Sequence, residues 1–215
     1  MAVERLARPS TNGCVQVTTK VFIATARPVG EECIDYAKNN MLDGFELCNN
    51  LEEANVVICV MYDKILSEDF IKDKRCYNFH GGLLPDYRGV GIFSWVIING
   101  EEETGITLHE LDAGLDTGPI ISCKKFLVTE ASTAHSLYTQ GMNAMLQLFK
   151  EYFHKLLIED YQATPVQKKP NSLYTRKMLS DLQDITRLAR AFHFPEKEGL
   201  YYKNSEGTKT IIEYD

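Results

Sequence analysis

Short apolar runs alternate with amphipathic or polar stretches along most of the chain. Runs of about four to eight apolar and β-branched residues, bounded by turn residues, predict strands that are buried in a sheet. Such runs are found at residues 20–25, 56–60, 75–80, 104–111 and 119–128. The run Val-Val-Ile-Cys-Val at 56–60 contains no polar residue, which is typical of a strand covered on both faces.

Helical patterns lie between these runs. The sequence predicts a helix that begins near Glu31, a short helical turn at 63–71, a buried helix at 92–98 that stops at Asn99-Gly100, and a long helix at 132–159. Strands separated by helices favour an α/β fold with an open, mostly parallel, Rossmann-like sheet. In such a sheet the ligand crevice lies beyond the carboxyl ends of the strands.

The two ends of the chain differ from this pattern. Residues 1–19 are polar and non-periodic and are interpreted as a flexible leader, so that residues 20–160 form the main domain. Residues 161–215 are expected to form a short appendage with a helix and a hairpin. The helix is expected at 180–192 after a Ser-x-x-Gln start, and the hairpin at 200–214 around a turn at 204–207.

Composition narrows the classes of protein to consider. The 215 residues suffice for one medium-sized domain, and 44% apolar with 25% charged residues is the balance of a globular chain. The net charge of −7 disfavours a nucleic-acid partner, which requires a basic patch. No apolar run approaches the roughly 18 residues that span a bilayer, and no secretory signal is evident. We therefore expect a cytoplasmic protein without membrane contact.

The six cysteines are spread singly along the chain and never form C-x-x-C. Cys59 and Cys76 fall inside predicted strands. We therefore expect the cysteines to be reduced and mostly buried rather than paired in disulfides or bound to metal.

The densest polar and glycine-rich segment covers residues 78–89, at the end of a predicted strand. Because side chains alternate along a strand, Asn78 and His80 point to the same side. They are expected to face the crevice together. The alternative is that Asn78 bonds to a loop backbone and that His80 is a packed core histidine.

A second cluster covers residues 105–119, where a predicted strand runs into a tight loop with the acids Asp112 and Asp116. Such a loop can place a carboxylate against His80. Aspartate in an Asp-x-Gly turn usually bonds its own backbone, so a purely structural role for Asp112 stays open.

The motifs Asn-x-His, Leu-Leu-Pro-x-Tyr-Arg-Gly and Gly-x-Thr-x-His followed by Leu-Asp-Thr-Gly-Pro occur in this order. In this combination the chain resembles the formyltransferase family that uses 10-formyltetrahydrofolate. The resemblance covers residues 20–159 and is sharpest over 77–121. It implies the formyltransferase fold and a catalytic triad of Asn78, His80 and Asp116.

The chemistry that the resemblance implies suits these groups. An amine attacks the formyl carbon, and the N–H groups of Asn78 and His80 would stabilise the oxyanion that develops. His80 would also take part in proton transfer, while Asp116 would orient it and hold a water that relays the proton from the amine to the folate nitrogen. No metal is needed, so His80, His109, Asp112 and Asp116 are not interpreted as a metal site.

The resemblance also assigns residues to the two substrates. Contacts with the folate are expected from Met61, Lys64, Ile65, Leu66, Leu111, Asp112, Gly114 and Asp116. Contacts with the acceptor are expected from Gly81, Gly82, Tyr87, Arg88, Tyr174, Arg176 and Lys177. Gly81-Gly82 departs from the family pattern and would open room beside the amine. A structural salt bridge is the alternative for Arg88, and Trp95 is expected in the core.

The acceptor is harder to predict. Residues 166–190 hold six basic and two acidic residues, a net charge of +4, and resemble the appendage of sugar N-formyltransferases. A positive segment would suit a diphosphate, and Tyr174 would stack on a base or sugar. The leading hypothesis is therefore a dTDP-linked 4-amino-4,6-dideoxyhexose as acceptor. The alternative for this segment is a solvated basic helix face.

Other functions remain open. The residues after 159 are too few for the barrel with which methionyl-tRNA formyltransferases hold tRNA, which disfavours that acceptor. Methionyl-tRNA and glycinamide ribonucleotide nevertheless stay as alternative acceptors, as does a hydrolase or a binding protein for formyl-folate. By analogy with sugar enzymes of the family, a homodimer through the tail hairpin is also possible.

Overall fold

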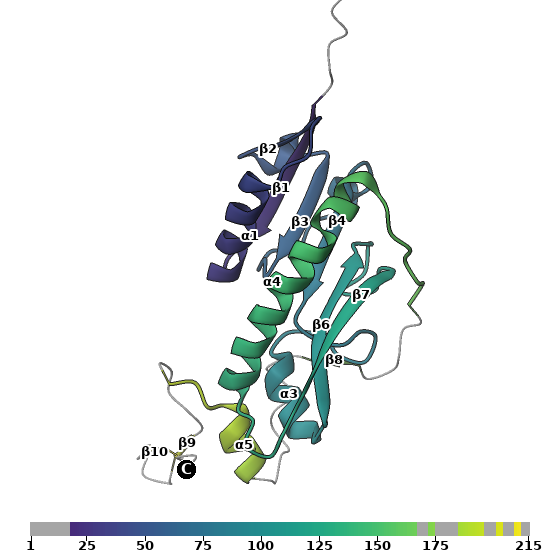
Figure 1. Cartoon of the computed structure of the whole chain (residues 1–215). Coiled ribbons are helices and arrows are strands. Elements are labelled where there is room, and N and C mark those ends of the chain that lie inside the picture. Colours follow the sequence, from purple (N-terminus) through teal and green to yellow (C-terminus); the bar gives the residue numbers. More distant parts are fainter. Residues whose placement is uncertain (1–17, 167–171, 175–184, 196–200, 204–208, 212–215) are drawn as a thin grey trace, which may run out of the picture.

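Six strands form a single sheet in the order β2-β1-β3-β4-β6-β7. The computed structural model describes residues 18–166, 172–174, 185–195, 201–203 and 209–211 (Figure 1). The strands of the sheet are β1 (Thr19–Thr25), β2 (Phe45–Leu47), β3 (Val56–Val60), β4 (Arg75–His80), β6 (Glu103–Glu110) and β7 (Ile120–Leu127). The first four of these run parallel, whereas β6 is antiparallel to β4 and β7 is antiparallel to β6. The mostly parallel α/β sheet that the sequence predicts is therefore confirmed.

Helices cover the two faces of the sheet unequally. They are α1 (Pro28–Asn39), the 3₁₀ turn η1 (Leu51–Glu53), α2 (Glu68–Ile71), α3 (Ile92–Asn99), α4 (Ala134–Ile158) and α5 (Ile185–Ala191). The long helices α1 and α4 lie side by side on one face (Figure 1), where Tyr36 of α1 meets Phe149 and Phe153 of α4 edge to face. The larger apolar core lies beneath them. A smaller cluster on the other face is covered by short elements and loops.

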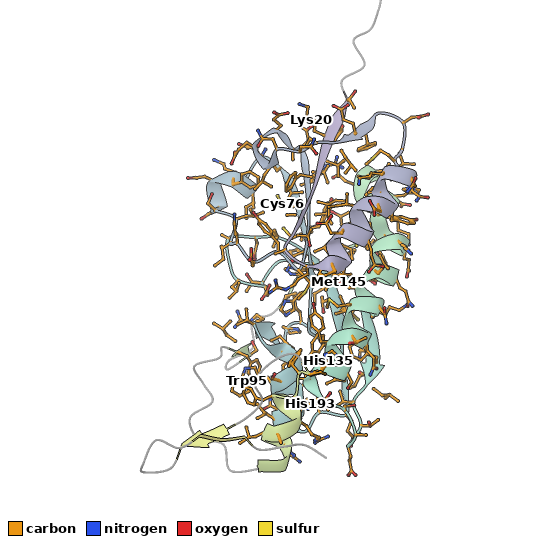
Figure 2. All side chains as sticks on the ribbon, turned by 90° about the vertical axis from the view of Figure 1, so that its left-hand side faces the viewer. Lys20, Cys76, Trp95, His135, Met145 and His193 are labelled. Carbon is orange, nitrogen blue, oxygen red and sulfur yellow. The ribbon has the colours of Figure 1, made fainter. Side chains whose placement is uncertain are left out.

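β3 shows why the apolar run at 56–60 is continuous. All five of its residues are buried, and they divide between the two cores: Ile58 belongs to the larger cluster, and Val57 and Cys59 belong to the smaller one. Figure 2, turned to show the sheet from its edge, places Met145 of α4 on one side and Cys76 of β4 on the other. The strand is therefore covered on both faces, as the sequence predicts.

The cysteines follow the same burial. Cys33, Cys59 and Cys76 are buried and free, and burial raises the pKa of the Cys33 and Cys59 thiols to about 12. Cys48 is half-buried and Cys123 is exposed, while Cys14 lies outside the described residues. Within the described part of the chain these five cysteines are free, and their reduced state stays a prediction.

Side-chain and glycine caps set the helix boundaries. Gly100 ends α3 in the left-handed conformation, with φ of 70°, as the Asn99-Gly100 pair predicts. Thr133 and Ser136 form a capping box that begins α4 at Ala134. α2 is shorter than the predicted turn at 63–71, because the Ser67 side chain accepts from the Phe70 N–H and starts the helix at Glu68.

The described parts of the C-terminal segment pack against the main domain. β8 (Leu173–Tyr174) pairs in parallel with β5 (Arg88–Gly89), a short strand in the loop after β4. α5 lies against α3, where the Ser94 hydroxyl donates to the Ala191 carbonyl at 2.7 Å. Figure 2 shows Trp95, His135 and His193 at this end of the molecule, and Trp95 is buried in the core as predicted.

The predicted hairpin is present as β9 (Tyr201–Lys203) and β10 (Lys209–Ile211), which pair antiparallel. Its turn at 204–207, the start of the predicted helix at Ser180, and residues 1–17 of the predicted leader lie outside the described residues. Thr19, assigned to the leader from sequence, is the first residue of β1. None of the helices in the described ranges is both long and apolar enough to cross a bilayer.

The capping box of α4 allows a direct test of one boundary. Thr133→Ala removes the side chain that accepts from the Ser136 N–H, and it should lower the free energy of unfolding by about 1 kcal/mol. Thr139→Ala, at an exposed site within the same helix, should lower it little or not at all because alanine favours helix. Urea unfolding of both variants measures the difference, and equal losses would show that the cap does not stabilise α4.

Candidate active site

The polar residues at the end of β4 face the middle of β6. In the antiparallel register Asn78 lies opposite His109, and His80 lies opposite Thr107. Because side chains alternate along both strands, these four side chains lie on one side of the sheet. The loop that follows β6 then returns Asp116 to the same place. The strand alternation expected for Asn78 and His80 is thus what aligns them.

Asp116 lies between the two histidines. Its Oδ1 is 3.6 Å from Nδ1 of His80 and 3.8 Å from Nε2 of His109. Nε2 of His109 is in turn 3.1 Å from Nδ2 of Asn78. The structure therefore brings Asn78, His80 and Asp116 into one cluster, and adds His109, which the sequence analysis left without a role.

A strained backbone holds the Asp116 carboxylate in place. Asp116 has φ of 51°, in the left-handed region that few non-glycine residues adopt. Its Oδ2 accepts the Gly89 N–H at 2.9 Å. Asp112 has a different function in the loop, because its Oδ1 accepts from the Gly114 N–H and the Thr117 hydroxyl. These bonds support the structural alternative for Asp112.

The ring of His80 is oriented by the same short segment. Its Nε2 lies 2.6 Å from the Tyr87 carbonyl oxygen, and a carbonyl oxygen only accepts, so Nε2 carries a hydrogen. Nδ1 is then the ring atom that faces Asp116. Gly82 permits this packing, because a Cβ there would lie 2.9 Å from the Tyr87 carbonyl and 3.1 Å from Nε2 of His80. The space beside Gly82 is therefore filled by the protein, whereas a Cβ on Gly81 would meet nothing closer than 3.9 Å.

The two tyrosines expected at the acceptor contact each other. The Tyr87 and Tyr174 rings stack with centroids 5.0 Å apart, and Trp95 packs on Tyr174 at 5.2 Å. The Tyr87 hydroxyl donates to Glu101 and accepts from Asn99. Among the described residues, Tyr87 and Tyr174 thus contact each other, and Tyr174 also contacts Trp95.

Of the other residues expected to contact the acceptor, Arg88 lies within the described part of the chain. Nε of Arg88 donates to the Ser172 hydroxyl at 3.0 Å, which joins the loop after β4 to the C-terminal segment. Among the described residues Arg88 forms no ion pair. Arg176 and Lys177 lie outside the described residues. The backbone of β5 and the Ser172 side chain were not expected at the site. The Tyr-Arg-Gly turn is the sequence signal that marks this segment.

The residues expected to bind the folate lie on two neighbouring segments. Met61 follows β3 with φ of 52°, and Lys64 is exposed. Ile65 is 86% exposed, an unusual position for an isoleucine. Leu66 and Leu111 pack on the same small apolar cluster, which brings the two segments to one side of the sheet. Among the described side chains, no group of three or more His, Cys, Asp or Glu residues is arranged to hold a metal ion.

Residues 16–152 match the formyl transferase family, and the chain belongs to this family. Among curated relatives, it is 35% identical over 154 residues to a methionyl-tRNA formyltransferase from Clostridioides difficile, covering 69% of this chain and 50% of that protein. It is 36% identical over 125 residues to the bifunctional polymyxin resistance protein ArnA of Wigglesworthia glossinidia brevipalpis, which covers 57% of this chain and 19% of that protein. The chain thus spans half or less of the length of the curated relatives it matches.

Solved structures share the fold over a longer part of the chain. A sugar N-formyltransferase from a Shewanella species superimposes with a TM-score of 0.80 at 19% identity, covering 91% of this chain and 96% of that one. An N-formyltransferase from Helicobacter canadensis was solved with folinic acid and dTDP-3-aminofucose. It superimposes with a TM-score of 0.72 at 22% identity, covering 83% of this chain and 82% of that one. The formyltransferase fold expected from sequence is confirmed.

Gly89 tests the link between β5 and the site. A Cβ on Gly89 would lie 2.4 Å from the Tyr174 carbonyl oxygen, and its φ is +96°. Gly89→Ala should therefore separate β5 from β8, destabilise the fold by about 1–3 kcal/mol, and lower turnover as Asp116 loses its N–H partner. Gly91→Ala is the matched control, because Gly91 also has positive φ (+72°) but no heavy atom within 4 Å. Turnover lowered equally by both variants would contradict this link.

His109 makes stability depend on pH. Burial, followed by the nearby charge of His80, lowers the pKa of His109 from 6.5 to about 4, while Asp116 opposes the shift. The unfolded chain therefore binds a proton that the folded chain does not, and stability is lost as pH falls from about 6.5 towards 4.

The loss of stability at acid pH that His109 causes should disappear when its imidazole is removed. Between pH 7 and pH 5 the linkage amounts to about 2 kcal/mol, and His109→Gln should reduce the acid-side loss by about that amount. Thr107→Val, at a buried and non-titrating site on the same strand, controls for general destabilisation. Urea unfolding at the two pH values measures the effect. An unchanged difference in His109→Gln would show that His109 is not held neutral.

Proposed function

We propose that this chain transfers a formyl group from 10-formyltetrahydrofolate to the primary amine of a dTDP-linked 4-amino-4,6-dideoxyhexose. The observation that carries the proposal is the convergence of Asn78, His80 and Asp116 at the carboxyl end of β4, the edge of the sheet where ligands of this class of fold bind. Membership of the formyl transferase family supports the reaction type.

Similarity to sugar enzymes supports a nucleotide sugar as acceptor. The match to the Shewanella sugar N-formyltransferase covers 91% of this chain, so it includes part of the segment after α4, where the family match has already ended at residue 152. A 4-N formyltransferase from Francisella tularensis gives a TM-score of 0.79 at 16% identity over 92% of this chain and 97% of that one. The Helicobacter canadensis structure contains a dTDP-linked amino sugar.

The residues present fit a folate. The turn at Met61 and the side chains of Ile65 and Leu66 follow β3, whose parallel neighbour β4 ends at the candidate site. Leu115, on the loop that carries Asp116, is 46% exposed and adds apolar surface. These two segments would hold the pterin, and the bound 10-formyltetrahydrofolate would supply the formyl group.

The site can supply both charge stabilisation and proton transfer. An N–H of the Asn78 amide can stabilise negative charge on the formyl oxygen during transfer. The amine must lose a proton as its bond to the formyl carbon forms, and the folate nitrogen must gain one as its own bond to that carbon breaks. In the described part of the chain no hydrogen bond engages Oδ1 of Asp116, which faces Nδ1 of His80 at 3.6 Å. We assign proton acceptance, direct or through a water, to this pair of atoms.

Turnover with defined substrates tests the proposal. Purified protein is incubated with 10-formyltetrahydrofolate alone, and then with dTDP-amino sugars, glycinamide ribonucleotide or methionyl-tRNA, while release of tetrahydrofolate is followed. Release that depends on the dTDP-amino sugar supports the proposal. Release without an amine would identify a hydrolase, and no release with any acceptor would identify a binding protein. The 35% identity to methionyl-tRNA formyltransferases makes methionyl-tRNA the most informative competing acceptor.

Variants test the catalytic assignment. Asn78→Ala, His80→Ala and Asp116→Asn should each lower kcat by at least about a hundredfold, the scale of losing a positioned catalytic group. The exposed His135, in the first turn of α4, provides the control His135→Ala, which should leave kcat unchanged. Near-normal kcat in all three site variants would overturn the assignment. The cytoplasmic location, the homodimer and the absence of a nucleic-acid partner stay predictions.

A further inference from the structure

His109 is fully buried in the centre of the candidate site, and the roles proposed above do not use it. It faces the catalytic residues from β6, directly across the antiparallel ladder from Asn78. This register, set by backbone hydrogen bonds, places the two side chains next to each other. An uncharged imidazole in such a place is either inert packing or an oriented hydrogen-bonding group.

The hydrogen bonds of His109 determine which ring nitrogen carries the hydrogen. Its Nδ1 lies 2.7 Å from the Glu110 carbonyl oxygen, which can only accept, so Nδ1 is the protonated nitrogen. Burial holds the pKa of His109 at about 4, so the ring is neutral near pH 7. A neutral imidazole with its hydrogen on Nδ1 has an unprotonated Nε2, which can only accept.

The unprotonated Nε2 determines the orientation of the Asn78 amide. Nε2 lies 3.1 Å from the Asn78 side chain, and only the amide nitrogen can donate to it. The amide oxygen in the same place would meet a second lone pair. We infer that His109 is a positioning residue that fixes the Asn78 amide in a single orientation, so that Asn78 acts as a hydrogen-bond donor. This inference rests on the proposed role of Asn78 in formyl transfer.

The charged groups around His109 act in opposite directions. Burial and His80 disfavour a proton on the ring, whereas the Asp116 and Asp112 carboxylates favour one, so burial and the hydrogen bond from Nδ1 to the Glu110 carbonyl decide for an unprotonated Nε2. Asp116 Oδ1 lies 3.8 Å from Nε2, the His80 ring centroid lies 6.4 Å from that of His109, and the Asp112 carboxylate acts on the ring from further away. A hydrogen on Nε2 would point towards Asp116 and would leave the Glu110 carbonyl without its donor. The Asn78 amide would then turn its oxygen towards His109.

Loss of this orientation should affect the chemical step. An amide that is free to turn presents its oxygen to the negatively charged formyl oxygen part of the time, which removes or reverses the stabilisation. The effect should appear in kcat, because the ground-state contacts with the nucleotide sugar are unchanged. The KM for the nucleotide sugar should stay within about threefold of wild type, as for an interaction made mainly in the transition state.

Nitrogen NMR of the unmodified protein tests the orientation directly. We expect the ¹⁵N shifts and ring couplings of His109 to show a hydrogen on Nδ1 and none on Nε2 between pH 6 and pH 8. A coupling across the hydrogen bond should join Nε2 to the Asn78 side-chain nitrogen. His109→Gln identifies the ring signals by their absence. A hydrogen on Nε2, or a charged ring in this range, would overturn the inference whatever the activity.

Paired variants separate positioning from packing. His109→Met fills a similar volume without an acceptor. It should lower kcat by about tenfold to a hundredfold, less than the outright loss of an oriented donor, because the amide remains and only its orientation is lost. His109→Gln, whose side-chain oxygen can accept from Asn78, should recover most of this loss. In an Asn78→Ala background, His109→Met should lower kcat no further, because there is no amide left to orient.

The outcomes distinguish this inference from the proposed function. An equal loss in the Asn78→Ala background would show that His109 acts by packing alone, and would overturn the inference. Normal formyl transfer by Asn78→Ala would instead overturn the catalytic role of Asn78, while the NMR result still decides its orientation. If His109→Met does not fold, the NMR measurement on the wild-type protein decides the question.

Discussion

Two backbone groups, the carbonyl of Tyr87 and the N–H of Gly89, hold the candidate site together. The first binds the His80 imidazole and the second binds the Asp116 carboxylate. Because peptide groups are planar and only Arg88 lies between them, this segment sets the separation of two side chains that come from different loops and strands. The segment is anchored in turn by the buried Tyr87 ring and by its pairing with β8. The geometry of the candidate site therefore depends on backbone groups as well as on side-chain contacts.

Much of the fold follows from local patterns. Burial and capping act over a few neighbouring residues and leave a pattern in the sequence. The structure contains the three elements predicted in this way: the buried strand β3, the long helix α4 and the end of α3 at Asn99-Gly100. β5 and β8 have two residues each, too few for any period to appear in the sequence. Their pairing joins residues more than eighty positions apart, so only the folded chain reveals it.

The geometry of the candidate site can likewise be predicted from the sequence only in part. Strand alternation places Asn78 and His80 on one side of the sheet, whereas the place of Asp116 beside them is expected from the resemblance to the formyltransferase family. The protonation pattern of His109 depends on a carbonyl oxygen and on burial, neither of which has a sequence signature. The Tyr87–Tyr174 stack likewise depends on tertiary contact, so the sequence alone does not reveal it.

The pairing of β8 with β5 bears on how the polypeptide can be divided. A boundary at residue 160 looks suitable for engineering a minimal catalytic fragment, because the six-stranded sheet and α4 are finished there. Such a cut would remove the partner strand of Arg88 and Gly89, the aromatic neighbour of Tyr87, and the Ser172 hydroxyl. The truncated product would keep every proposed triad member and still lack the scaffold that orients them. Residues 172–174 are therefore part of the scaffold of the candidate site.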